Sequence, residues 1–159
     1  MNQFALWHEM CKNEEISPDI VTLTEVIATL DSASGKVNRQ RADEVFLDAV
    51  NQRLILRQDS LDTSWEFDLS YMSLPIARAA SRYIFGQISE RCSSDTGDKG
   101  GGDEVKDLSL ITGTSRMREH IREVLRDELK PAVHCIVPQR EQGTLIAKKK
   151  IVQNYVSGQ

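Results

Sequence analysis

Apolar residues recur at helical spacing through the first third of the chain, and this spacing predicts three amphipathic helices. Ser17-Pro18 separates the first helix from the second, and a break from Ser32 to Gly35 separates the second from the third. Thr22 and Glu25 have the spacing of a capping box at the start of the second helix. The expected core positions are Phe4, Trp7, Cys11, Leu23, Val26, Ile27, Leu30, Ala42, Val45, Phe46, Ala49 and Val50.

After Arg53 the period of the pattern changes from that of a helix to that of a strand. Residues 65–70 alternate between apolar and polar side chains, which predicts a half-buried strand. Ser73 is placed to cap a following helix, with Pro75 in its first turn. The apolar face expected on that helix comprises Ile76, Ala79, Ala80, Tyr83, Ile84 and Ile88.

The same layout of strand, turn and helix occurs a second time. Residues 108–111 predict a short strand, Thr112-Gly113 a turn, and Ser115 a helix cap. The helix that follows ends at Pro131, and its expected buried ridge comprises Met117, Ile121, Val124, Leu125 and Leu129. Residues 133–137 and 144–147 predict two more strands, so the expected order is βαβαββ.

We therefore predict an α/β fold, with a two-layer βαβαββ domain at residues 64–150 preceded by α-helical hairpins at residues 1–58. Two strands joined through a helix pair in parallel, and parallel neighbours end at the same edge of a sheet. Asp68 and Thr112-Gly113 should therefore lie side by side. The stretch from Ser93 to Glu104 has no apolar residue, which favours a flexible surface loop around residues 93–107.

Composition places the chain among ordinary globular proteins. Hydrophobic residues make up 40% and charged residues 28% of the sequence. The net charge of −4 provides no global positive field, so contact with nucleic acid would need a local basic patch. The odd number of cysteines, 3, favours free thiols in a reducing compartment. No apolar run approaches a membrane span, and Glu9, Glu14 and Glu15 argue against a transit peptide at this N-terminus.

The helical part resembles a pentatricopeptide-repeat protein. Residues 4–10 (Phe-Ala-Leu-Trp-His-Glu-Met) and 16–23 (Ile-Ser-Pro-Asp-Ile-Val-Thr-Leu) resemble the junction between two repeats, and residues 42–46 resemble the second helix of the next one. The resemblance covers about one and a half repeats. Such repeats read single-stranded RNA one base at a time, and by motif position Asp19 and Thr24 would read bases. The alternative, which so few repeats favour, is that both are simply helix-terminus residues.

A helical solenoid needs about three repeats for stability. This predicts that the chain is the C-terminal part of a longer repeat protein or a shortened gene model.

Residues 65–149 resemble the small MutS-related (Smr) domain. The resemblance is carried by Phe-Asp-Leu-Ser at 67–70 with residues 72–80, by Ile-Thr-Gly-Thr-Ser at 111–115, and by Gly-Thr-Leu-Ile at 143–146. The family's first motif is Leu-Asp-x-His followed by Gly, and its second is Thr-Gly-x-Gly. In this chain Ser70, Tyr71 and Ser115 replace the His and the two Gly residues of those motifs. Pentatricopeptide arrays that end in an Smr domain occur in eukaryotic organellar RNA proteins, so each resemblance supports the other.

Some Smr domains cleave nucleic acids, and the resemblance makes Asp68 the candidate catalytic residue. A carboxylate can bind a metal or orient water, but Ser70 in place of His removes the obvious general base. His120 and His134 are expected to be structural. The sequence implies no cofactor, except a divalent metal if the domain is a nuclease. It contains no Cys-x-x-Cys, His-Glu-x-x-His, Walker phosphate loop or Gly-x-Ser-x-Gly motif.

Binding tolerates these replacements better than catalysis does. A helix N-terminus attracts phosphate, Gly permits close approach of the backbone, and arginine binds phosphate bidentately. The expected nucleic-acid-binding residues are Thr112, Gly113, Thr114, Ser115, Arg116, Arg118, Lys148 and Lys149. For the lysine run the alternative is a solvated chain end, and for Thr112-Gly113 it is an ordinary strand-to-helix turn.

The resulting prediction is an RNA-binding protein of gene expression in the chloroplast or mitochondrion. The repeats would contact single-stranded RNA, and the Smr-like domain would contact phosphate or nucleic-acid structure. RNA is the expected partner, with DNA and other organellar RNA-processing proteins as further partners, and no membrane. The alternatives are a metal-dependent endonuclease that uses Asp68 and a protein interaction module without affinity for nucleic acid.

Overall fold

The computed structural model describes residues 2–93 and 104–159. Most of the predicted flexible loop lies outside these residues. The chain divides into two compact units, Met1–Gln58 and Asp59–Gln159, and each is described by itself below.

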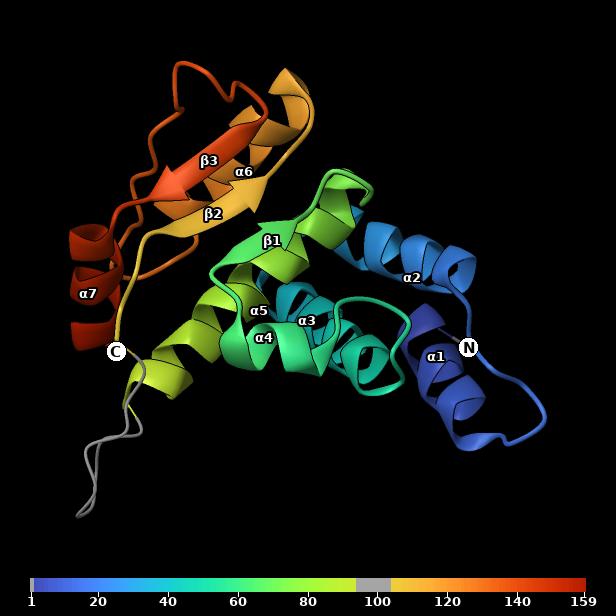
Figure 1. The fold of residues 1–159 in the computed structure, drawn as a ribbon. Coiled ribbons are helices and arrows are strands. Elements are labelled where there is room, and N and C mark those ends of the chain that lie inside the picture. Colours follow the sequence, from blue (N-terminus) through green and yellow to red (C-terminus); the bar gives the residue numbers. More distant parts are fainter. Residues whose placement is uncertain (1, 94–103) are drawn as a thin grey trace, which may run out of the picture. The chain divides into compact units, whose positions relative to one another are not determined.

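The first unit consists of three helices, α1 (Gln3–Lys12), α2 (Ile20–Ser32) and α3 (Lys36–Asn51), as the sequence predicts (Figure 1). Helices α2 and α3 pack against each other, and α1 packs against both. Gly35, with φ of +85°, makes the turn between α2 and α3. The expected core is confirmed except that Phe4 and Cys11 are half-buried; the fully buried members include Trp7, Leu23, Ile27, Val45, Phe46 and Ala49.

The cap of α2 differs from the prediction. Its N-cap residue is Asp19, whose Oδ1 accepts hydrogen bonds from the Thr22 amide at 2.8 Å and from the Thr22 hydroxyl at 2.9 Å. The expected capping box that starts at Thr22 is therefore wrong, because the helix begins two residues earlier, at Ile20. The bonds from Thr22 lower the pKa of Asp19.

The second unit contains a small sheet with helices packed on it. Its elements are α4 (Gln58–Thr63), β1 (Glu66–Asp68), α5 (Leu74–Ser93), β2 (Leu108–Ile111), α6 (Ser115–Asp127), β3 (Thr144–Ala147) and α7 (Lys149–Ser157). The strand order is β1-β2-β3, with β1 and β2 parallel and β2 and β3 antiparallel. Figure 1 shows α6 behind β2 and β3, and α6 also packs against α5. The α/β class and the parallel pair are confirmed.

The predicted strand at 133–137 does not form. Only Ile136 pairs with Ile146, through two backbone hydrogen bonds of 2.9 Å. The Val133 amide instead donates to the Leu125 carbonyl of α6 at 2.9 Å. Because the Val133 amide is bound to α6, this segment pairs with the sheet only through the Ile136 bridge. The order of elements after α5 in the described chain is therefore βαβα rather than the expected βαββ.

Two helices lie outside the prediction. Helix α4 is a short segment before β1, and α7 begins in the lysine run, for which the sequence predicted either a basic patch or a solvated chain end. Helix α7 packs on α5, with the ring centroids of Phe85 and Tyr155 5.3 Å apart in an edge-to-face arrangement. This packing explains why nine residues, too few for a stable isolated helix, are helical here.

The helical layer is held by buried apolar faces and by one charged cluster. The predicted core of α5 and α6 is confirmed, apart from Tyr83, which is half-buried. The Glu128 carboxylate, whose side chain is 9% exposed, pairs with Arg78 and Arg82 of α5. Among the described residues, no helix is long and apolar enough to cross a bilayer.

Candidate nucleic-acid interface

The two strand-turn-helix segments, which begin at β1 and at β2, meet at one edge of the sheet. Asp68 is paired with Ile111 in the parallel register, and the Leu69 amide donates to the Ile111 carbonyl at 2.8 Å. Beyond this pair lie Ser70 and Gly113. A Cβ atom placed on Gly113 would lie 2.9 Å from the Cβ of Ser70, and Gly113 has φ of +73°. Gly113 is therefore required both by the backbone conformation and by the close approach of Ser70.

Asp68, the candidate catalytic residue, is exposed at the end of β1. Its Oδ1 accepts hydrogen bonds from the Ser70 amide at 2.9 Å and from the Ser70 hydroxyl at 2.6 Å. Ser70, which the resemblance aligns with the His of the Smr motif, thus donates to this carboxylate. No group of three or more His, Cys, Asp or Glu side chains suited to a metal occurs among the residues that the structure describes.

The turn after β2 is fixed by a single carbonyl. The Gly143 oxygen accepts from the Thr112 amide at 2.7 Å, the Thr112 hydroxyl at 2.9 Å and the Gly113 amide at 3.1 Å. Thr112 is 1% exposed, so its side chain points inward and supports the turn. Gly143 lies so close that a Cβ there would be 3.4 Å from the Gly113 backbone. The Smr-like pattern contains this glycine, but the sequence alone does not reveal its role as acceptor.

The start of α6 is open to solvent. Thr114, not Ser115, is the N-cap residue, since its hydroxyl oxygen accepts from the Met117 amide at 3.1 Å. Gly113 to Arg116 are all exposed. Within the described part of the chain, the amides of Ser115 and Arg116 have no hydrogen-bond partner. Two donors at the positive end of a helix dipole therefore face solvent.

The two arginines of the first turn of α6 differ in their surroundings. The Arg118 guanidinium donates to the Gln142 carbonyl at 2.7 Å and to Glu119 at 3.1 Å, and its side chain is 18% exposed. Arg118 thus secures the loop before β3. Arg116 is exposed and has no ion pair among the described residues. It is the cation that is available beside the two open amides.

Acidic side chains pair with two members, Lys148 and Lys149, of the lysine run at residues 148–150. Lys148 Nζ donates to Asp107 at 2.9 Å, the Lys149 amide donates to the same carboxylate at 2.7 Å, and Lys149 Nζ donates to Glu104 at 2.8 Å. These bonds lower the pKa of Asp107 and of Glu104. Asp107 also holds the start of α7 through the Lys149 amide. The local field of the lysines is correspondingly reduced.

The side chains of the two expected base-reading residues are engaged within their own helix. Asp19 caps α2, and the Thr24 hydroxyl donates to the Ile20 carbonyl at 2.7 Å. Base reading by these residues stays a prediction. The two histidines predicted to be structural differ: His120 Nε2 lies 3.1 Å from the Leu74 carbonyl, whereas His134 is exposed.

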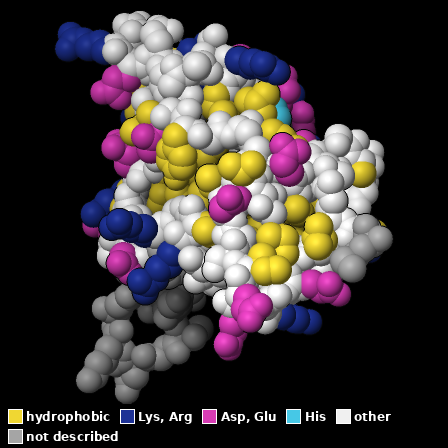
Figure 2. Space-filling view, turned by 90° about the vertical axis from the view of Figure 1, so that its right-hand side faces the viewer, with side chains coloured by type: hydrophobic (Ala, Val, Ile, Leu, Met, Phe, Trp, Pro, Cys, Tyr) yellow, Lys and Arg dark blue, Asp and Glu magenta, His cyan; other side chains and the backbone are white. Residues whose placement is uncertain are grey.

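The surface carries no block of one charge on the face shown in Figure 2, where acidic and basic side chains are interspersed. Hydrophobic side chains also reach the surface there. The exposed large hydrophobic residues of the first unit are Leu6, Ile16, Ile20, Val21, Val37 and Leu47.

Comparisons of the chain with protein-family models, with curated proteins and with solved structures found no match. The resemblances to pentatricopeptide repeats and to the Smr domain therefore stay predictions.

Proposed function

We propose that this protein binds RNA in organellar gene expression, and that its second unit holds an RNA phosphate at the start of α6. The observation that carries this proposal is the open turn at Gly113–Arg116. Two amides, those of Ser115 and Arg116, lie on this exposed edge without hydrogen-bond partners among the described residues. The Arg116 guanidinium lies beside them and has no ion pair with any described residue.

The chemistry of this turn suits a phosphate group. Backbone amides at a helix N-terminus point at an anion, and the helix dipole favours its negative charge. The Arg116 guanidinium adds a charge-assisted, bidentate donor. Gly113 allows the positive φ of this turn and its close contact with Ser70, which together place the two amides at the exposed edge. Because these groups contact phosphate rather than base edges, they supply affinity and position without sequence preference.

Sequence preference is assigned to the first unit. The pair formed by α2 and α3 is the kind of helical hairpin from which pentatricopeptide arrays are built, and α1 packs on it as part of a neighbouring repeat would. In this proposal Asp19 and Thr24 face the RNA bases. The same resemblance assigns the protein to the chloroplast or mitochondrion.

Binding is preferred over cleavage for a reason specific to this chain. Asp68 has a hydroxyl, that of Ser70, where the family has an imidazole, and a hydroxyl at its ordinary pKa is a poor general base. The Asp68 carboxylate accepts hydrogen bonds from the Ser70 amide and hydroxyl, so its role in this proposal is to hold the turn beside Gly113.

The proposal is tested by the affinity for a fluorescein-labelled single-stranded RNA, measured by anisotropy at several salt concentrations. Arg116→Gln should weaken binding and lower the salt slope by about 0.7, the value for one lost contact to a single strand. Lys130→Gln is the matched control, because it removes the same charge from an exposed side chain beyond α6. Equal affinities of the two variants, or no salt-sensitive binding by the parent protein, contradict the proposal.

A further inference from the structure

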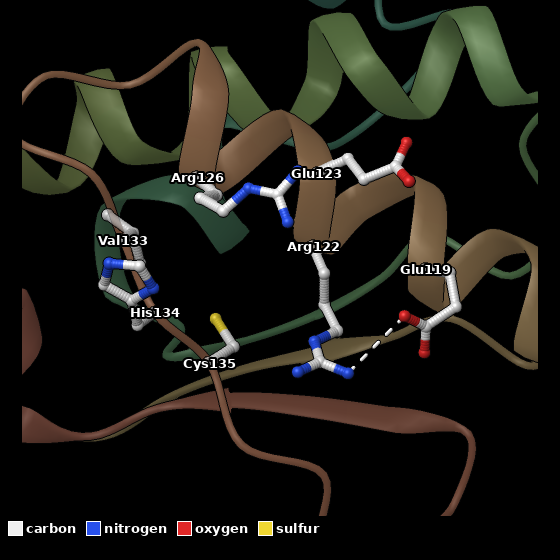
Figure 3. A pocket seen from close by; sticks show the side chains of 7 residues that line it. All are labelled: Glu119, Arg122, Glu123, Arg126, Val133, His134 and Cys135. Carbon is white, nitrogen blue, oxygen red and sulfur yellow. Dashed lines mark hydrogen bonds and ion pairs between the residues drawn. The ribbon is translucent and has the colours of Figure 1, made fainter.

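A small polar notch lies on the second unit, between α6 and the segment 133–135 (Figure 3). It has a volume of about 190 Å³. Arg122 and Arg126, one turn apart on α6, contribute guanidinium groups, and His134 lies opposite them. Glu119 and Glu123 contribute carboxylates, and Cys135 contributes a thiol. The proposed function makes no use of any of these groups.

The wall opposite α6 is fixed in place. The Val133 amide donates to the Leu125 carbonyl at 2.9 Å, and Ile136 is paired with Ile146 through two bonds of 2.9 Å. Residues 133–136 are thus held at both ends, and Val133 is buried. Burial raises the pKa of the Cys135 thiol to about 12, so this group adds no negative charge to the notch. The notch is therefore preformed rather than a gap in a loose loop.

The guanidinium groups of the notch differ in their protein partners. Arg122 lies 3.5 Å from Glu119, with both side chains about half exposed. An exposed single contact of this kind contributes little to stability, so a phosphate can replace it at low cost. Arg126 makes two hydrogen bonds to Asp127, of 2.7 and 2.9 Å, between side chains that are 56% and 58% exposed. Arg122 is therefore the guanidinium group that is more readily available to a phosphate.

The lining selects the chemistry of the ligand. Two guanidinium groups and an imidazole suit an anion, whereas Glu119 and Glu123 suit a hydrogen-bond donor. The volume of 190 Å³ is below the range of roughly 300–1,000 Å³ that is usual for small-molecule pockets, which favours one unit of a longer chain. Within a nucleic-acid backbone, phosphate supplies the anion, and the 2′-hydroxyl, present only in RNA, supplies a donor.

We infer that this notch binds one sugar-phosphate unit of RNA, with the phosphate held by Arg122, Arg126 and His134 and the 2′-hydroxyl donating to Glu119. The inference rests on the proposed RNA binding and deepens it, since it adds a contact that distinguishes RNA from DNA. Phosphate bound at the start of α6 would carry no such distinction.

Two variants test the inference by anisotropy, with an RNA and a DNA of the same sequence. Arg122→Gln should weaken RNA binding about three- to tenfold and lower the salt slope by about 0.7, while the control Lys130→Gln leaves both unchanged. Glu119→Ala should bring the ratio of RNA to DNA affinity towards one. Affinities of Arg122→Gln equal to those of the control, or an unchanged ratio in Glu119→Ala, overturn the inference.

A second measurement separates this inference from the proposed function. Ribose 5-phosphate and inorganic phosphate are titrated separately into the ¹⁵N-labelled chain, and the amide signals of Val133, His134 and Cys135 are followed. We expect saturable shifts with ribose 5-phosphate and weaker ones with inorganic phosphate. If no shift occurs, the notch does not bind sugar phosphate and the inference fails, even where Arg116→Gln still weakens RNA binding. If shifts occur in a protein that does not bind RNA, the proposed function fails and the notch binds free sugar phosphates instead.

Discussion

Replacing Gly113 tests the close approach of Gly113 and Ser70, on which the candidate site depends. Gly113 has φ of +73°, and a Cβ there would lie 2.9 Å from the Cβ and 3.7 Å from the Cα of Ser70. A non-glycine residue in the left-handed region costs about 1–2 kcal/mol. Forcing a methyl group against packed atoms costs about 1–3 kcal/mol more. Gly113→Ala should therefore lower the free energy of unfolding by about 2–5 kcal/mol, a large part of the usual total of about 5–15 kcal/mol.

Gly86→Ala is the matched control. Gly86 lies inside α5, and a Cβ there would meet nothing within 4 Å. The same substitution should stabilise the protein by about 0.5–1 kcal/mol, because alanine is the better helix former. The two substitutions should thus change the free energy of unfolding in opposite directions, although the chemical change is identical.

The assay is urea unfolding followed by the indole NMR signals of the two tryptophans. Trp65 belongs to the second unit and Trp7 to the first, so the two units are followed separately. Gly113→Ala should shift the transition of Trp65. Adding Ser70→Gly removes the Cβ contact but not the positive φ, so the double variant should recover about 1–3 kcal/mol relative to the sum of the single changes. A Gly113→Ala protein as stable as the parent would refute the arrangement of Ser70 and Gly113 described above.

Four further substitutions have defined outcomes. Glu128→Gln should cost about 2–3 kcal/mol, because it removes the buried carboxylate that accepts charge-assisted hydrogen bonds from Arg78 and Arg82. Burial raises the pKa of Glu128, but its arginine partners outweigh this effect and lower the pKa overall. The contribution of Glu128 to the free energy of unfolding is therefore present above the ordinary glutamate pKa and disappears as the pH falls through the lowered value. The stability of the variant in urea should consequently depend less on pH than that of the parent below about pH 5. Glu104→Gln releases Lys149 and should raise RNA affinity about two- to fivefold with unchanged stability, and an unchanged affinity would show that this lysine takes no part. Thr114→Ala should cost about 1 kcal/mol in urea unfolding and Ser115→Ala less than about 0.5 kcal/mol, and the reverse order would restore Ser115 as the cap of α6.

The hydrophobic pattern predicted most of the helices and the parallel pair for physical reasons that are local or topological. The faces of α2, α3 and α5 repeat over three or more turns, so their burial follows from the period alone. The closeness of Asp68 and Gly113 follows from the helical crossover between β1 and β2, which forces parallel strands.

The parts that sequence could not predict depend on contacts between distant residues. Either hydroxyl, that of Thr114 or that of Ser115, could cap α6; the structure has Thr114 as the cap, directly after a turn that is bound to the distant Gly143 carbonyl. The segment 133–137 has strand-like residues, but the Leu125 carbonyl takes its first amide. Helix α7 depends on packing against α5.

The same limit applies to the candidate site. Arg116 and Arg118 are equivalent in the sequence, and only the position of the Gln142 carbonyl commits Arg118 to the loop. The acidic partners of the lysine run likewise come from residues more than forty positions away, Lys148 to Asp107 and Lys149 to Glu104. The notch at Arg122 and His134 joins α6 to residues 133–135, for which the sequence pattern predicts a strand in the sheet rather than a wall against α6.

We have proposed that RNA phosphate binds at the start of α6. The most direct measurement is a titration of unlabelled single-stranded RNA into the ¹⁵N-labelled chain, with the amide signals of Ser115 and Arg116 compared with those elsewhere in the second unit. We expect large, saturable shifts of these two signals that shrink as salt is raised, since both amides lack partners among the described residues. RNA binding that leaves the Ser115 and Arg116 signals in place would contradict it.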